Sequence, residues 1–213
     1  MSESRPYVKE ACIETLEQAI AAENKGADRI ELCSNLQLEG LTPSNDLIVQ
    51  VLDKINIPVR VMIRPRTGNF LYSEKEITEM KRTVITCKNL GVEGVVFGVL
   101  KADKTLDIDI ISMLTNLAFP LNVVIHKAID NTPDLLKEFE KLKAIKGIST
   151  ILTSGGAKTA IEGCGVLKEM IATSQNAIEI MPAGKITFEN LSEIHCLLGA
   201  SAYHGKQIVG KLS

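Results

Sequence analysis

The sequence predicts an α/β fold of the closed (β/α)₈ barrel type, with parallel strands and a truncated or missing eighth helix. Short β-like segments alternate with helical patterns along the whole chain, which favours a parallel sheet with helical crossovers. The β-like segments number eight, as this barrel requires. No G-x-G-x-x-G turn follows the first segment, which argues against an open dinucleotide-binding sheet. The expected strands span residues 8–12, 28–33, 58–64, 92–98, 121–126, 148–153, 177–181 and 200–204.

Helical patterns occupy the segments between these strands. The third helical segment begins with Ser73 and Glu76, which have the spacing of a capping box. Apolar residues recur at the 3.6-residue spacing of an amphipathic helix, and this predicts helices that pack against the outside of the barrel. In the second helical segment this stripe consists of Leu47, Ile48, Val51, Leu52 and Ile55.

The end of the chain is too short for a complete barrel wall. Only Gly205 to Ser213 follow the last expected strand, so a full eighth helix is not expected. We therefore predict a single domain over residues 1–213, with a short N-terminal tail at 1–6 and a C-terminal tail at 205–213. The wall between the first and seventh helices would be bare, and a second copy could cover it. A homodimer or a higher homo-oligomer is expected.

Composition excludes several classes of partner. Hydrophobic residues make up 45% and charged residues 23%, the net charge is −2, and no block of like charge occurs. Neither a nucleic acid nor a membrane is an expected partner, and no apolar segment approaches the length of a transmembrane helix. The N-terminus lacks the apolar core of a signal peptide. The five cysteines are scattered without a C-x-x-C, so a disulfide framework is not expected and the chain is expected in the cytoplasm.

Polar residues gather where the expected strands end. In a parallel barrel all these ends open on one mouth, so residues far apart in sequence would line one pocket. Glutamate and cysteine stand two positions apart at the ends of the first two strands, and residues two apart on a strand share a face. The pairs are Glu10 with Cys12 and Glu31 with Cys33.

Strand alternation predicts which side chains enter the barrel. In the third strand Val59, Val61 and Ile63 alternate with Arg60, Met62 and Arg64, and the apolar set must face the helices. The charged set then lies inside, where buried charges need partners. A structural role is available for them as interior ion pairs of Arg29, Arg60 and Arg64 with Glu10, Glu31 and Glu179.

Four sequence blocks resemble a known family. They are GADRIELC at 26–33, EGLTPS at 39–44, MIRPRTGNF at 62–70 and ILTSG at 151–155. They are similar to the CutC family, named for copper homeostasis, and the short C-terminus resembles its shorter bacterial members. The resemblance runs from about residue 7 to residue 205. It implies a TIM-type barrel, a cytosolic location and a link to copper.

The resemblance also implies a copper site. The family's proposed Cu(I) ligands correspond to Cys12 and Cys33, and thiolates are the soft ligands that suit Cu(I). The alternative is that both are ordinary buried core cysteines, since cysteine is among the most buried residue types. Lys127 stands where many members have arginine. Lysine keeps the charge but cannot bind a planar anion through the two parallel hydrogen bonds of a guanidinium group. No organic cofactor is predicted.

Two further functions remain open. A metal-independent barrel enzyme would act on a small phosphorylated or carboxylated substrate, with His126 and Glu31 as an acid-base pair and Arg64 and Arg66 binding the anion. A non-catalytic small-molecule binder would use the same mouth. The other candidate anion-binding residues are Lys127, Asp130, Thr153, Ser154, Gly155, Gly184, Lys185 and His204.

Overall fold

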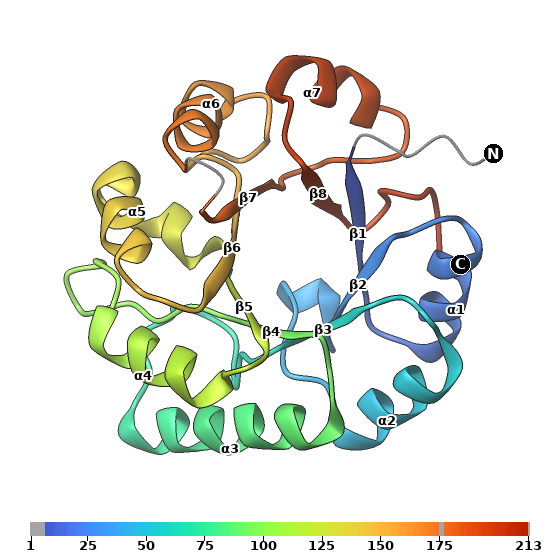
Figure 1. Ribbon diagram of the computed structural model, residues 1–213, viewed down its shortest axis with the longest axis horizontal. Helices are drawn as coiled ribbons and strands as arrows, with labels where there is room; N and C mark the ends of the chain where they lie inside the picture. Colours follow the sequence, from blue (N-terminus) through green and yellow to red (C-terminus); the bar gives the residue numbers. More distant parts are fainter. Residues whose placement is uncertain (1–6, 175–176, 213) are drawn as a thin grey trace.

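The computed structural model describes residues 7–174 and 177–212, so the expected tail at 1–6 lies outside the described residues. Eight parallel strands surround one centre and the helices lie outside them (Figure 1). All eight expected strands are present, with ends displaced by a few residues at most. They are β1 (Val8–Ile13), β2 (Arg29–Leu32), β3 (Val59–Met62), β4 (Gly94–Phe97), β5 (Asn122–Ile125), β6 (Ile148–Thr153), β7 (Glu179–Pro182) and β8 (Ala202–Gly205).

Strand pairing closes most of the barrel. The hydrogen-bonded order is β7-β6-β5-β4-β3-β2-β1-β8, and every pairing in it is parallel. β7 and β8 lie side by side at the remaining seam, where no ladder joins them in the described part of the chain (Figure 1). The fold is therefore the predicted (β/α)₈ barrel, nearly closed.

The helices begin with the capping chemistry that the sequence predicts. The Ser44 side chain accepts a hydrogen bond from Leu47 N at the start of α2, and Ser73 and Glu76 form the complete capping box of α3. Between residues 7 and 212 the described helices are α1 (Leu16–Asn24), α2 (Asn45–Lys54), α3 (Glu74–Leu90), α4 (Ile108–Ala118), α5 (Leu135–Lys143), α6 (Cys164–Thr173) and α7 (Leu191–Leu198), with the 3₁₀ turns η1 (Leu36–Leu38) and η2 (Lys127–Asn131).

A layer of ion pairs fills the N-terminal half of the barrel interior. Glu10 is fully buried and bonds Arg29, and its Oε2 lies 3.4 Å from Nη1 of Arg60. Arg29 also bonds Glu179 at 3.2 Å, and Arg60 bonds Glu93 at 2.8 Å. The predicted interior ion pairs are thus confirmed for Arg29, Arg60, Glu10 and Glu179.

A second interior layer, nearer the mouth, is apolar and contains sulfur. It places two thiols and two thioethers among aliphatic side chains, on the opposite side of the strands from the main core that packs under the helices. Such surroundings exclude water and lower the local dielectric. Its buried members are Cys12, Cys33, Met62, Val96, Val124, Leu152, Met181, Ala183 and Ala202.

No helix follows β8 within residues 206–212, as predicted. Instead the C-terminal segment runs beside α1, where Lys25 Nζ donates to Lys211 O. Beside β1 and the start of α7 lies a groove of about 400 Å³. The homo-oligomer that would cover this side stays a prediction. The groove is lined by Tyr7, Lys9, Phe188, Glu189, Leu191 and Ser192.

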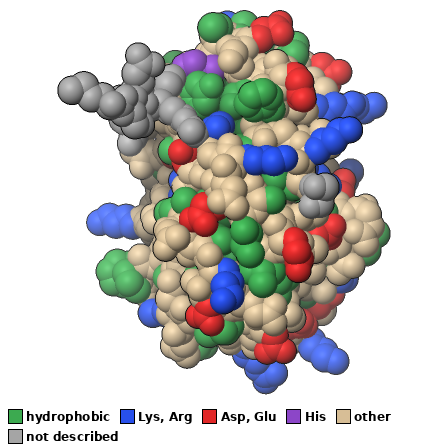
Figure 2. Space-filling model, turned by 90° about the vertical axis from the view of Figure 1, so that its right-hand side faces the viewer, with side chains coloured by type: hydrophobic (Ala, Val, Ile, Leu, Met, Phe, Trp, Pro, Cys, Tyr) green, Lys and Arg blue, Asp and Glu red, His purple; other side chains and the backbone are tan. Residues whose placement is uncertain are grey.

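On the face drawn in Figure 2, acidic and basic side chains are interspersed with apolar ones, and neither sign of charge gathers into a patch. No described helix has the length and apolar character that crossing a membrane requires.

Candidate functional site

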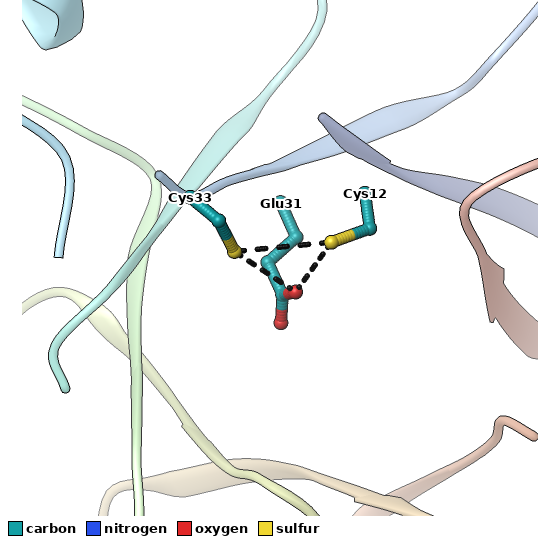
Figure 3. A group of neighbouring side chains, drawn as sticks. All are labelled: Cys12, Glu31 and Cys33. Atoms are coloured by element: carbon teal, nitrogen blue, oxygen red, sulfur yellow. Dashed lines mark hydrogen bonds between the residues drawn. The ribbon is translucent and has the colours of Figure 1, made fainter. Parts of the chain in front are cut away.

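Two thiols and a carboxyl group meet inside the barrel mouth. Cys12 Sγ lies 3.8 Å from Cys33 Sγ, and Glu31 Oε2 lies 3.2 Å from the first sulfur and 3.5 Å from the second (Figure 3). All three side chains are at least 95% buried. The two sulfurs are free thiols rather than a disulfide. These three residues, here called the thiol cluster, could hold a metal ion.

Strand register explains why the thiol cluster forms. Cys12 on β1 stands directly opposite Glu31 on β2, and both point inward. Cys33 follows two residues after Glu31 and so points inward as well. The loop after β2 then folds back over Cys33. A Cβ at Gly40, where φ is +86°, would lie only 3.1 Å from Cys33 Sγ, so glycine permits this close approach.

His204 on β8 extends the thiol cluster toward the ion-pair layer. Its Nδ1 lies 3.0 Å from Glu10 Oε1, and its Nε2 lies 3.7 Å from Glu31 Oε2. The imidazole therefore stands between two carboxyl groups that come from neighbouring strands. Sequence reasoning assigned His204 to anion binding, whereas the structure surrounds it with carboxyl groups.

Burial and neighbouring charges give these groups unlike acidities. Burial raises the pKa of Glu31 well above its ordinary value, which favours the neutral acid. Burial also opposes ionisation of Glu10, but the His204 hydrogen bond and the charge of Arg29 outweigh it, and the pKa of Glu10 falls to about 2. The hydrogen bond from Cys33 lowers the pKa of the Cys12 thiol, so Cys12 is the more acidic of the two cysteines.

The interior ion-pair role does not extend to Glu31 and Arg64, which lie nearer the mouth. Glu31 contacts no arginine among the described salt bridges, since its neighbours are the two thiols and His204. Arg64 donates instead to backbone carbonyls, at 3.1 Å to Leu38 O, 3.2 Å to Gly40 O and 3.2 Å to Gly68 O. The β1–β2 register places Glu31 opposite Cys12, and alternation along a single strand does not predict that register.

The proposed acid-base pair of His126 and Glu31 is not assembled. His126 Nδ1 accepts the Ala128 N–H at 3.2 Å, and its Nε2 has no partner in the described part of the chain. Its ring packs on Phe70, with centroids 4.8 Å apart. No hydrogen bond or salt bridge among the described residues joins His126 to a carboxylate.

An internal carboxylate fills the predicted anion loop after β6. Asp130 accepts hydrogen bonds from the hydroxyls of Thr153 and Ser154 and from the backbone N–H groups of Ser154 and Gly156. Lys127 Nζ lies 3.8 Å from the same carboxylate. The loop does bind an anion, but that anion is a side chain of this protein.

The remaining predicted anion-binding residues lie outside the thiol cluster. Arg66 is committed to Glu76 and to the backbone carbonyls of its own loop. A Cβ at Gly184 would lie 3.0 Å from Ser154 Cβ, so this glycine packs the loop after β7 against the loop after β6. A Cβ at Gly155 would meet Gly163 O at 2.5 Å. Lys185 has a left-handed backbone, φ +57°, and its carbonyl accepts from the Asn190 side chain.

Sequence reasoning missed Gly98. It follows β4 at an inward position, and a Cβ there would lie 2.7 Å from the His126 ring. The absent side chain lets the histidine ring extend over β4 toward β3. The available signal was a glycine at the mouth end of a strand with inward parity.

The chain is similar to members of one protein family over almost its whole length. The model of the CutC family matches residues 7–209. The human copper homeostasis protein cutC homolog is 40% identical over 198 residues, which cover 93% of this chain and 72% of that protein. A CutC family protein of Mesorhizobium japonicum is 39% identical over 95% of this chain and 78% of its own length.

A solved structure shares the whole architecture. The putative copper homeostasis protein CutC from Streptococcus agalactiae superposes with a TM-score of 0.88 at 33% identity, covering 95% of this chain and 99% of that one. At that coverage the correspondence spans nearly the whole of both chains. With the family model and the curated relatives in agreement, the chain belongs to the CutC family.

Proposed function

We propose that this protein binds Cu(I) through Cys12 and Cys33 and acts in copper homeostasis. The observation that carries the proposal is the 3.8 Å separation of two buried, inward-facing thiols from neighbouring strands. The names of the human and streptococcal relatives link those proteins to copper homeostasis. The free state of all five cysteines agrees with a reducing compartment such as the cytoplasm.

The sulfur geometry suits a shared soft ion. With metal–thiolate bonds of about 2.3 Å, as in zinc sites, two sulfurs at 120° about one ion stand ~4.0 Å apart. The observed 3.8 Å between Cys12 Sγ and Cys33 Sγ is close to that value, so binding needs little movement of either strand. Cu(I) prefers thiolate and thioether ligands. The thioether of Met62 belongs to the same buried layer, on the strand next to Cys33.

Glu31 is better suited to a supporting role than to ligation. A carboxylate is a hard ligand and matches Cu(I) poorly. The raised pKa of Glu31 favours a neutral carboxyl group, and its Oε2 contacts both sulfurs. It can hydrogen-bond a thiolate and hold it in place, as outer partners of metal ligands commonly do.

A competition titration tests the proposal. Reduced, metal-free protein is titrated with Cu(I) against a chromophoric Cu(I) chelator, in a Cys164→Ser/Cys196→Ser background that removes the two least buried thiols. We expect one ion per chain, lost in the further Cys12→Ser/Cys33→Ser variant and kept in a matched Cys87→Ser variant, whose thiol lies on α3. Equal stoichiometry with and without Cys12 and Cys33 contradicts the proposal. Circular dichroism establishes that each variant is folded.

A further inference from the structure

Two buried N–H donors near the barrel mouth lack acceptors. Arg64 Nε and His126 Nε2 have no hydrogen-bond partner among the described residues, although the two side chains are 98% and 96% buried. Buried polar groups are nearly always paired, and leaving a donor without an acceptor is costly. The two donors follow β3 and β5, which have only β4 between them. An acceptor on a bound ligand would satisfy them.

The tautomer of His126 is fixed by its surroundings. Nδ1 accepts the Ala128 N–H at the start of η2, so the ring proton must sit on Nε2. Burial and the nearby charge of Arg64 lower the pKa of His126 to about 3, which keeps the ring neutral. The Nε2–H group is therefore a hydrogen-bond donor at neutral pH, and no acceptor for it lies among the described residues.

Arg64 is a buried cation with little countercharge. Its Nη1 and Nη2 atoms donate to the carbonyls of Leu38, Gly40 and Gly68, which are neutral. The one described carboxylate within salt-bridge distance is that of Glu39, at 3.7 Å, and its side chain is 85% exposed. A buried charge held only by neutral dipoles and a solvent-exposed partner favours a closer anion.

Phe70 contacts both donor side chains, and Gly98 leaves room for the His126 ring. Arg64 Cζ lies 4.9 Å from the Phe70 ring centroid, and the His126 ring lies 4.8 Å from the same centroid. The missing side chain of Gly98 allows the His126 ring to lie over β4, the strand between β3 and β5. One aromatic ring thus contacts both donor side chains.

We propose that Arg64 Nε and His126 Nε2 form an oxyanion-binding subsite at the barrel mouth, which takes a carboxylate or phosphate oxygen of a small ligand. The ligand accepts one hydrogen bond from the cation and one from the neutral imidazole. Its negative charge balances Arg64. The subsite uses none of the thiol cluster, so it does not rest on the copper proposal.

The test follows the His126 ring directly by NMR. Metal-free protein labelled with ¹⁵N in histidine is titrated with inorganic phosphate and, separately, with acetate, at constant ionic strength set by sodium chloride. We expect a saturable shift of the His126 Nε2 resonance with at least one probe, and the responding probe identifies the ligand chemistry. Absence of a saturable shift with both probes overturns the proposal and needs no variant.

Two variants and a control assign the contacts. Asparagine at position 126 can still accept the Ala128 N–H but lacks the Nε2 donor, so H126N should weaken binding of the responding probe at least about tenfold. R64K keeps the charge and loses Nε, with the same expected loss. R82Q, on the exposed face of α3, should leave affinity unchanged. Isothermal titration calorimetry measures all three. Unchanged affinity in both H126N and R64K overturns the proposal.

Discussion

Glu10 and Glu31 enter the same barrel from adjacent strands, yet their surroundings favour opposite charge states. Glu10 faces Arg29 and Arg60, and its pKa is lowered to about 2. Glu31 faces two thiols, one of its oxygens has no partner among the described residues, and its pKa is raised. His204 lies between the two carboxyl groups. The boundary between the ion-pair layer and the thiol cluster therefore runs through this histidine.

The two glutamates should respond differently to the same substitution. Glu10→Gln leaves two buried arginines short of a carboxylate, and loss of one partner from a buried ion pair costs about 3–5 kcal/mol. The raised pKa of Glu31 favours a neutral carboxyl group, and Glu31→Gln replaces it with a neutral amide of similar shape, so we expect a loss of less than about 1 kcal/mol. Urea denaturation of the metal-free variants measures both. Equal losses of unfolding free energy would show that Glu31 is also ionised.

His126 should make stability depend on pH. Its pKa is about 3 in the folded protein against 6.5 ordinarily, so the unfolded chain binds the proton more tightly. The contribution is fully present above pH 6.5 and is lost as pH falls toward 3, at roughly 1.4 kcal/mol per pH unit.

The H126N variant isolates this contribution. Asparagine does not titrate in this range, so the stability of the variant should fall less steeply between pH 6.5 and 3 than that of the wild type. Urea midpoints at intervals of half a pH unit measure the difference. Parallel curves for the two proteins would exclude a depressed His126 pKa.

Asp130 should stabilise the loop after β6. Asp130→Ala removes the acceptor of two hydroxyls and two backbone N–H groups, and we expect a loss of about 2–4 kcal/mol. The amide of Ser154 should exchange with solvent faster, as hydrogen exchange would show. Asp103→Ala is the matched control, because Asp103 bonds only Thr105 among the described hydrogen bonds and lies on an exposed turn. Similar losses in both variants would mean that Asp130 does not organise the loop.

The groove beside β1 lies on the side of the barrel that a second copy is predicted to cover. Phe188 lines it and is 62% exposed. If a second copy covers this side, light scattering should give at least twice the mass of one chain, and Phe188→Ser should shift the distribution toward the monomer. Phe119→Ser is the control, since Phe119 is 72% exposed at the end of α4. A single-chain mass for the wild type at micromolar concentration would exclude the predicted dimer.

Local sequence patterns predicted the barrel and which side chains of its strands enter the interior. Alternation along β3 placed Arg60 and Met62 inside, because successive side chains on a strand point to opposite faces. Cysteine spacing and the family resemblance also pointed to Cys12 and Cys33, which the structure brings together.

The missed features depend on long-range geometry. The thiol environment of Glu31 follows from the β1–β2 register, which single-strand alternation does not encode. Asp130 meets the loop after β6 only because η2 folds back against it. The position of the His126 ring over the end of β4 depends on the missing side chain of Gly98, which directly follows that strand.

X-ray absorption at the copper K-edge tests the central proposal most directly. With one equivalent of Cu(I) under reducing conditions, in the Cys164→Ser/Cys196→Ser background, we expect a first shell dominated by sulfur, with at least two scatterers, from Cys12 and Cys33. The sulfur shell should disappear in the Cys12→Ser/Cys33→Ser variant. A first shell of nitrogen and oxygen with Cys12 and Cys33 present, or an unchanged sulfur shell after both are replaced, would contradict Cu(I) binding at the thiol cluster.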